Sequence, residues 1–144
     1  MTRFSTIASA ALAVGLALPA AASAAPVAID MSGLRAGGTL YVQLQTRDQF
    51  LGVGRAAGRI VETPAAGALS LDLGDVAPGD YAVTVWHDDN GNHQFDVNPS
   101  TGAPADGWAT ANAEGLRGRP TFEQVRLTIP AAGLRVPLAL HYGR

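Results

Sequence analysis

Short runs of alternating hydrophobic and polar residues recur along the chain from Pro26 onward, with Gly, Pro, Asp and Asn between them. A period of two is typical of strands that bury one face, whereas helices need a period near 3.6. In the stretch LRVPLALHY, every second residue from Leu134 to Tyr142 is hydrophobic or aromatic. Pro137 lies on the opposite face and cannot donate a backbone hydrogen bond, so we expect this strand at a sheet edge.

Other segments differ in how many of their faces are hydrophobic. GTLYVQLQT alternates and predicts a half-buried strand, whereas DYAVTVWH is hydrophobic or aromatic on both faces and predicts a central strand. Further strands are expected in VAIDMSGL, GRIVE, LSLDL and FEQVRLTI. The stretch from Val53 to Ala57 is the one place in this region where we expect a short helical turn.

About seven strands with frequent turn signals predict an all-β protein. The fold class that we expect is an antiparallel β-sandwich, because no segment after the first 24 residues sustains a helical period. The chain after the first 24 residues has 144 − 24 = 120 residues, which is the usual size of one domain. We therefore predict a single β-sandwich domain over residues 25–144.

The N-terminus has the features of a secretory signal peptide. A positive charge at Arg3 precedes a hydrophobic stretch from Ile7 to Leu18, and the small residues Ala22-Ser23-Ala24 follow. The hydrophobic stretch is shorter than the roughly 20 residues that a membrane-spanning helix needs. We predict a signal peptide over residues 1–24, a periplasmic or secreted location, and no membrane insertion after cleavage.

Composition narrows the function further. The chain has no cysteine, which excludes disulfides and thiol catalysis. All ten basic residues are arginines, and loss of Arg3 with the signal peptide leaves nine against twelve acidic residues, a net charge of 9 − 12 = −3. The arginines are scattered, so we expect no nucleic-acid partner. The expected partner is an unidentified component of the cell envelope or the extracellular space.

The loop after the expected central strand, within VWHDDNGNHQFDVN, carries oxygen-bearing side chains at alternate positions. Calcium takes six to eight oxygen ligands, and alternate positions of a tight loop converge on one point. Gln94 would contribute its backbone carbonyl, and Asp106 is the nearest downstream carboxylate, ahead of Glu114. The predicted calcium site therefore comprises Asp88, Asn90, Asn92, Gln94, Asp96 and Asp106.

The match to a calcium loop is partial, and two other interpretations stay open. His93 stands at the sixth position, where Gly is usual, and Pro99 stands where a bidentate Glu is usual. In the first alternative, the Asp and Asn side chains bond neighbouring backbone groups in a metal-free polar turn. In the second, His87 and His93 hold zinc together with a carboxylate.

No group of residues fixes catalytic roles, so we assign no catalytic residue. A small hydrolase remains an alternative, with its carboxylate pair drawn from Asp88, Asp106, Glu114 and Glu123. Another alternative is a metal-free ligand-binding or adhesion sandwich that uses Trp108 and the long polar segment from Gly102 to Pro120. Trp108 would stack on a sugar or a partner, or else cover one end of the core.

The order of motifs between Gly79 and Glu123 resembles the exported bacterial family called domain of unknown function 2141. The matching positions are Gly79, Tyr81, His87, Asp88, Asn90, Asn92, Asp96, Gly102, Pro104, Asp106, Gly107, Pro120, Phe122 and Glu123. The departures are His93 for Gly, Asp106 for Glu, and WATAN where an aromatic-Gly-Phe-Ser-Asn run is typical. The resemblance implies export and an immunoglobulin-like or transthyretin-like β-sandwich, but no substrate. We therefore expect a non-catalytic binding or structural module.

Overall fold

The computed structural model of the chain describes residues 23–143. The predicted signal peptide lies outside the described residues, except for Ser23 and Ala24, which are exposed ahead of the first strand. Between residues 23 and 143, no helix is long and hydrophobic enough to cross a membrane.

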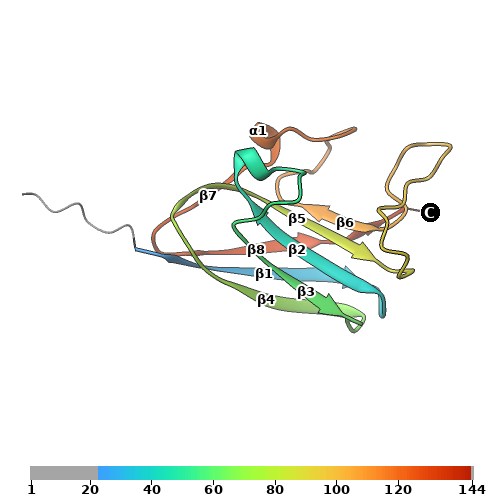
Figure 1. Cartoon of the computed structure of the whole chain (residues 1–144), viewed down its shortest axis with the longest axis horizontal. Coiled ribbons are helices and arrows are strands. Elements are labelled where there is room, and N and C mark those ends of the chain that lie inside the picture. Colours follow the sequence, from blue (N-terminus) through green and yellow to red (C-terminus); the bar gives the residue numbers. More distant parts are fainter. Residues whose placement is uncertain (1–22, 144) are drawn as a thin grey trace, which may run out of the picture.

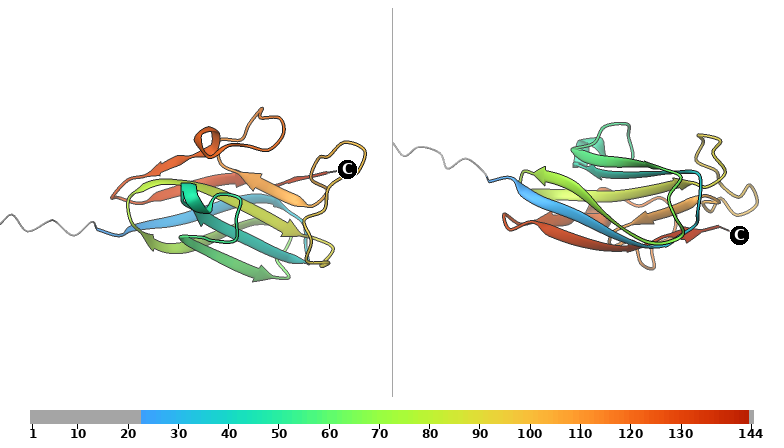
Figure 2. Two further views of the ribbon diagram at one scale, coloured as in Figure 1. Left: turned by 45° about the horizontal axis from the view of Figure 1, so that its top comes forward. Right: turned by 90° about the horizontal axis from the view of Figure 1, so that it is seen from below.

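Two β-sheets stack face to face (Figures 1 and 2). The smaller sheet has the order β4-β1-β8, with β1 at Ala25–Leu34, β4 at Gly67–Val76 and β8 at Leu134–Ala139. The larger sheet has the order β3-β2-β5-β6-β9, and β7 pairs with the start of β5. Its strands are β2 at Thr39–Gln45, β3 at Ala57–Glu62, β5 at Gly79–Asp88, β6 at Gly107–Thr110, β7 at Leu127–Ile129 and β9 at His141–Tyr142. The all-β sandwich expected from the sequence is confirmed.

The main core lies between the sheets and is built from the alternating hydrophobic positions. Ile29 of β1, Leu40 of β2 and Val83 of β5 are fully buried in it. Each such side chain contributes about 1.5–3 kcal/mol by leaving water. A smaller cluster of Ala82, Phe122 and Val125 lies outside this core.

Two expectations about strand position are confirmed. β5, which is hydrophobic on both faces, lies between β2 and β6. β8, which contains Pro137, forms an edge of the smaller sheet. Its pairing with β1 is parallel, whereas the other strand pairs are antiparallel. A parallel pair needs a long connection, and here the chain between β1 and β8 includes strands of the larger sheet.

The segment FEQVRLTI was predicted to be one strand, and this was wrong. Its first half forms the short helix α1, Phe122–Val125, and only Leu127–Ile129 is a strand. The Gln124 side-chain oxygen accepts a hydrogen bond from the Thr121 backbone N–H at 2.9 Å. This contact is half of a capping box, which starts a helix and overrides the local alternation.

The expected helical turn from Val53 to Ala57 is also misplaced. A 3-10 turn, η1, occupies Arg47–Gln49 instead. Gln45, expected on a polar strand face, is only 1% exposed, and its amide nitrogen lies 2.8–3.1 Å from the carbonyl oxygens of Gln49, Gly52 and Gly54. The buried glutamine thus holds the loop after η1 in a non-helical shape.

Two further segments differ from their expected form. LRVPLALHY was treated as one strand, but it divides into β8 of the smaller sheet and β9 of the larger one. The Leu140 backbone N–H between them bonds the Ser32 carbonyl at 2.9 Å. The polar segment Gly102–Pro120 is not wholly irregular, because β6 lies within it. β6 and β9 pair at the edge of the larger sheet, beside the predicted site.

Candidate functional site

β5 ends with two consecutive buried polar residues, His87 and Asp88, both 0% exposed. Successive strand residues point to opposite faces, so the two side chains serve different contacts. Gly38 lies against this point, because a Cβ there would be 2.0 Å from the Asp88 carbonyl oxygen. The turn between β1 and β2 therefore packs directly on the start of the Asp/Asn loop.

The Asp88 carboxylate organises the loop through three backbone N–H groups. Its Oδ1 accepts from Gly91 at 2.8 Å and from Asn92 at 3.2 Å, and its Oδ2 accepts from His93 at 2.8 Å. Asp side chains in turns commonly bond backbone groups a few residues ahead. Asp88 therefore has a structural role here whether or not a metal binds.

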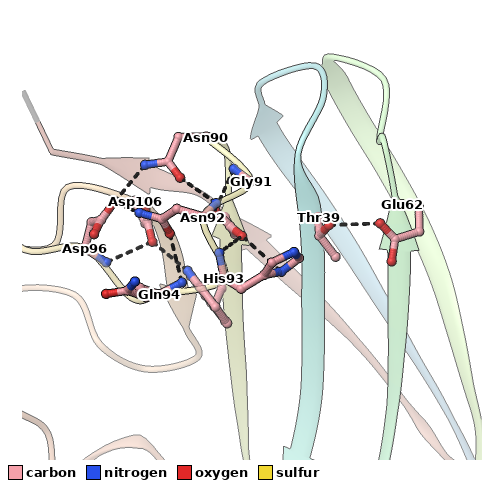
Figure 3. Close-up of polar contacts among 11 residues, drawn as sticks. Thr39, Glu62, Asn90, Gly91, Asn92, His93, Gln94, Asp96 and Asp106 are labelled. Atoms are coloured by element: carbon pink, nitrogen blue, oxygen red, sulfur yellow. Dashed lines mark hydrogen bonds and ion pairs between the residues drawn. The ribbon is translucent and has the colours of Figure 1, made fainter.

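The side chains of Asn90, Asn92 and Asp96 meet at one point (Figure 3). The two amide nitrogens donate to the same Asp96 Oδ2, at 2.7 Å and 2.8 Å. The amide oxygens accept backbone N–H groups, from Asn92 to Asn90 at 2.9 Å and from Gln94 to Asn92 at 2.8 Å. The loop thus shows both the convergence expected of a cation loop and the backbone bonds expected of a polar turn.

Asp106 joins this loop to the sheet from the start of β6. Its Oδ2 accepts the Trp86 indole N–H at 2.8 Å and the Asp96 backbone N–H at 3.0 Å, and the residue is 1% exposed. The following Gly107 leaves room for a ring, because a Cβ there would lie 2.4 Å from Tyr142. The Asp-Gly pair therefore combines a buried acceptor with a position that only glycine fits.

His87 belongs to a second network behind the loop. Its Nε2 lies 2.8 Å from the Gly37 carbonyl oxygen and therefore donates, which leaves Nδ1 to accept the Tyr142 hydroxyl at 2.6 Å. The Tyr142 oxygen in turn accepts the Arg35 backbone N–H at 3.0 Å. Burial raises the pKa of the Tyr142 hydroxyl, and this outweighs the opposite effects of the Arg35 backbone N–H and guanidinium.

This network bears on the zinc alternative, which uses His87 and His93. His87 bonds the backbone carbonyl of Gly37, in the turn between β1 and β2. Both of its ring nitrogens are hydrogen-bonded, so the arrangement offers no free nitrogen for zinc. His93 adopts a left-handed backbone with φ +60°, the conformation for which calcium loops use Gly.

The six residues predicted to bind metal are not equally placed. Asn90, Asn92 and Asp96 touch one another, and of the other predicted ligands Asp106 contacts only the backbone of Asp96. Asp88 binds the loop backbone, and the exposed Gln94 donates its N–H to Asn92. In the part of the chain from residue 23 to 143, no three His, Asp or Glu side chains form a group able to hold a metal. Any cation here needs the asparagine amides.

The carboxylates proposed for a hydrolase have different surroundings. Glu123 forms an ion pair with Arg47 and, at 3.1 Å, with Arg126. Glu114 lines a hollow beside β6. Asp88 and Asp106 do not line it, and they do not line a second hollow, which lies on the smaller sheet. Sequence analysis missed Tyr142 as part of the site, because its pairing with His87 depends on β9 crossing to the larger sheet.

Comparison with known proteins places the chain in a family. No curated protein and no solved structure matches it. A family model described as an uncharacterized protein conserved in bacteria matches residues 29–136, which include every strand from β2 to β7 and the whole Asp/Asn loop. The chain therefore belongs to the family of domain of unknown function 2141.

Proposed function

We propose that this chain is an exported, non-catalytic binding or structural module of the cell envelope whose Asp/Asn loop holds a calcium ion. The observation that carries the calcium proposal is that the amide nitrogens of Asn90 and Asn92 both lie within 2.8 Å of Asp96 Oδ2. Rotation of each amide would turn its oxygen toward that point, and oxygen ligands are those that calcium prefers. The Gln94 carbonyl would add a backbone ligand.

Asp88 and Asp106 support such a site from two sides. Asp88 Oδ2 has two lone pairs and accepts one N–H, so it can still face a cation, whereas Asp88 Oδ1 and Asp106 Oδ2 each accept two N–H groups. Asp88 holds Gly91 to His93 in their turn, and Asp106 fixes the backbone of Asp96. These contacts also favour the non-catalytic proposal over a hydrolase, because the two carboxylates are engaged by backbone and indole donors.

Thermal unfolding tests the calcium proposal. Residues 25–144, which include every helix and strand described, would be unfolded in chelator, in calcium and in magnesium. A ligand that binds only the folded state stabilises it by about 2.7 kcal/mol at a hundredfold excess over Kd. We expect a rise in the unfolding midpoint that is larger with calcium than with magnesium. An identical midpoint in chelator and calcium would contradict the proposal.

The most informative variant is Asp96→Asn. Its remaining oxygen can accept the same two amide N–H groups, so the metal-free loop should change by less than about 1 kcal/mol. Loss of the carboxylate charge should lower calcium affinity by about tenfold or more. Asp89→Asn is the matched control, because Asp89 pairs with Arg35 at 2.9 Å outside the converging set. Equal calcium responses in both variants would remove Asp96 from the site.

Export is proposed from the N-terminal sequence. The positive charge, the short hydrophobic stretch and the small residues up to Ala24 support removal of residues 1–24. The N-terminus of the protein recovered from outside the cytoplasm should then be Ala25. A protein that keeps its N-terminal residues and stays inside the cell would contradict this proposal.

A further inference from the structure

A hollow of about 390 Å³ lies at the edge of the larger sheet, where β6, β9 and β8 meet the connection that follows β6. Its volume is within the range of roughly 300–1,000 Å³ that is usual for small-molecule sites. Leu116 in this connection also packs on the small cluster around Phe122, which anchors that wall. The lining includes Trp108, Thr110, Glu114, Leu116, Pro137 and His141.

The polar side chains that line this hollow have no partner in the part of the chain that the structure describes. Across residues 23–143, no hydrogen bond or ion pair engages the Trp108 indole N–H, the Thr110 hydroxyl, the Glu114 carboxylate or the His141 ring nitrogens. The side chains of Trp108 and His141 contact each other as rings, with centroids 5.7 Å apart. Four polar side chains that face one hollow without internal partners are available to a ligand.

The second hollow shows that this is not a general property of the surface. It has a volume of about 520 Å³ on the smaller sheet and is lined by Ser70, Asp72 and Arg135. Ser70 and Arg135 both donate to Asp30 at 2.6 Å, and Asp72 accepts the Gly74 N–H at 2.7 Å. Its polar side chains are therefore engaged by the protein, whereas those beside Trp108 are free.

We propose that the hollow beside Trp108 binds a neutral saccharide of one or two pyranose rings. A pyranose has an apolar C–H face that can lie on the indole ring, and a rim of hydroxyl groups that both donate and accept hydrogen bonds. The free groups supply both kinds of partner, because the indole N–H donates, Glu114 accepts, and Thr110 does either.

Charge complementarity decides against other ligands. Glu114 is the only formal charge among the lining residues, so an anionic ligand would face an unbalanced carboxylate. A quaternary ammonium ion suits Trp and Glu but carries no acceptor, so it would leave the indole N–H unpaired. The saccharide proposal names the ligand of the binding module proposed above and does not depend on calcium.

The test uses the two tryptophans of the chain, Trp86 and Trp108, as reporters within one sample. An ¹⁵N–¹H correlation spectrum of residues 25–144 contains one indole N–H signal for each, and Trp108→Phe assigns them. Maltose, cellobiose and N,N′-diacetylchitobiose would be titrated to millimolar concentration. We expect at least one to shift the Trp108 signal to saturation and to leave Trp86, bonded to Asp106 at 2.8 Å, unchanged.

Matched variants complete the test. Glu114→Gln should weaken saccharide binding roughly tenfold, since a hydrogen bond to a charged group is lost. Glu62→Gln makes the same change outside the hollow, where it can still accept from Thr39, and should bind normally. Saccharide titrations in calcium and in chelator show whether saccharide binding depends on calcium. Thermal unfolding tests calcium binding separately, so the two proposals can fail independently.

Three outcomes would overturn the proposal. The first is that no saccharide moves the Trp108 signal in either calcium or chelator. The second is that choline, the organic-cation probe, moves it and the saccharides do not. The third is that Glu114→Gln binds as tightly as the unsubstituted chain, which would place the ligand elsewhere.

Discussion

Trp86 and Trp108 are direct partners across β5 and β6, yet they belong to different kinds of surroundings. Trp86 stacks on Tyr41 at a centroid distance of 4.6 Å and donates its indole N–H to buried Asp106. Trp108 touches the His141 ring and lines the hollow, and its N–H has no partner among the described residues. One indole is hydrogen-bonded within the fold, whereas its neighbour lines a hollow.

The same difference separates the two regions that these residues introduce. In the Asp/Asn loop, polar side chains bond the backbone or one another, whereas beside Trp108 they have no partner among residues 23–143. A paired buried polar group contributes to stability, because removal of its partner leaves a desolvated group behind. A free group at the surface contributes little. Substitutions in the loop should therefore change stability, and those in the hollow should change binding.

The largest effect is expected for Asp88→Ala. The Gly91 and His93 backbone N–H groups lose their acceptor, and the Asn92 N–H keeps only its bond to Asn90, so we expect the free energy of unfolding to fall by about 3 kcal/mol, even in chelator. Urea denaturation in chelator measures this. Asp88→Asn keeps one acceptor oxygen and should lose about half as much. A loss below about 0.5 kcal/mol for Asp88→Ala would show that the loop does not depend on its internal bonds.

A smaller effect of opposite sign is expected for His93→Gly. The left-handed backbone at φ +60° costs a residue with a Cβ about 1 kcal/mol, and glycine adopts it freely. Glycine also loses more chain entropy on folding, so the net stabilisation should be about 0.5 kcal/mol. The urea midpoint should rise slightly with an unchanged slope.

Gly91→Ala provides the converse control in the same loop. Gly91 has φ +72°, and a Cβ there would meet no atom within 4 Å. Only backbone strain then opposes alanine, so this variant should lose about 1 kcal/mol. If His93→Gly destabilised the chain as well, His93 would have to contribute a contact that outweighs its strain.

Sequence reasoning located the loop better than it located the strands around it. Alternate Asp and Asn positions after a central strand identified the convergence of Asn90, Asn92 and Asp96, because spacing along a tight turn fixes which side chains meet. The capping signal at Thr121 and Gln124 was present in the sequence, but the prediction of one strand followed the alternation instead. Local alternation alone does not distinguish a helical turn from the start of a strand.

Other features depend on tertiary contacts that no local pattern contains. The division between β8 and β9 follows from Leu140 bonding Ser32, more than a hundred residues away. The hollow beside Trp108 forms only because β9 crosses to the larger sheet and brings His141 against β6. The sequence indicated Trp108 and Glu114 separately, whereas their common hollow and unpaired state required the fold.

The smallest stability effect is expected for Thr110→Val. Thr39, a second threonine of the same sheet, provides the matched comparison. The Thr110 hydroxyl has no partner among the described residues, so its removal should change stability by less than about 0.5 kcal/mol. The hydroxyl of buried Thr39 donates to Glu62 at 2.9 Å, so Thr39→Val should cost about 1 kcal/mol. Saccharide affinity, read from the Trp108 indole signal, should follow the reverse order and fall severalfold only for Thr110→Val. Equal stability losses in the two variants would mean that the Thr110 hydroxyl is satisfied by the folded chain, and the distinction between paired and free groups in this sheet would fail.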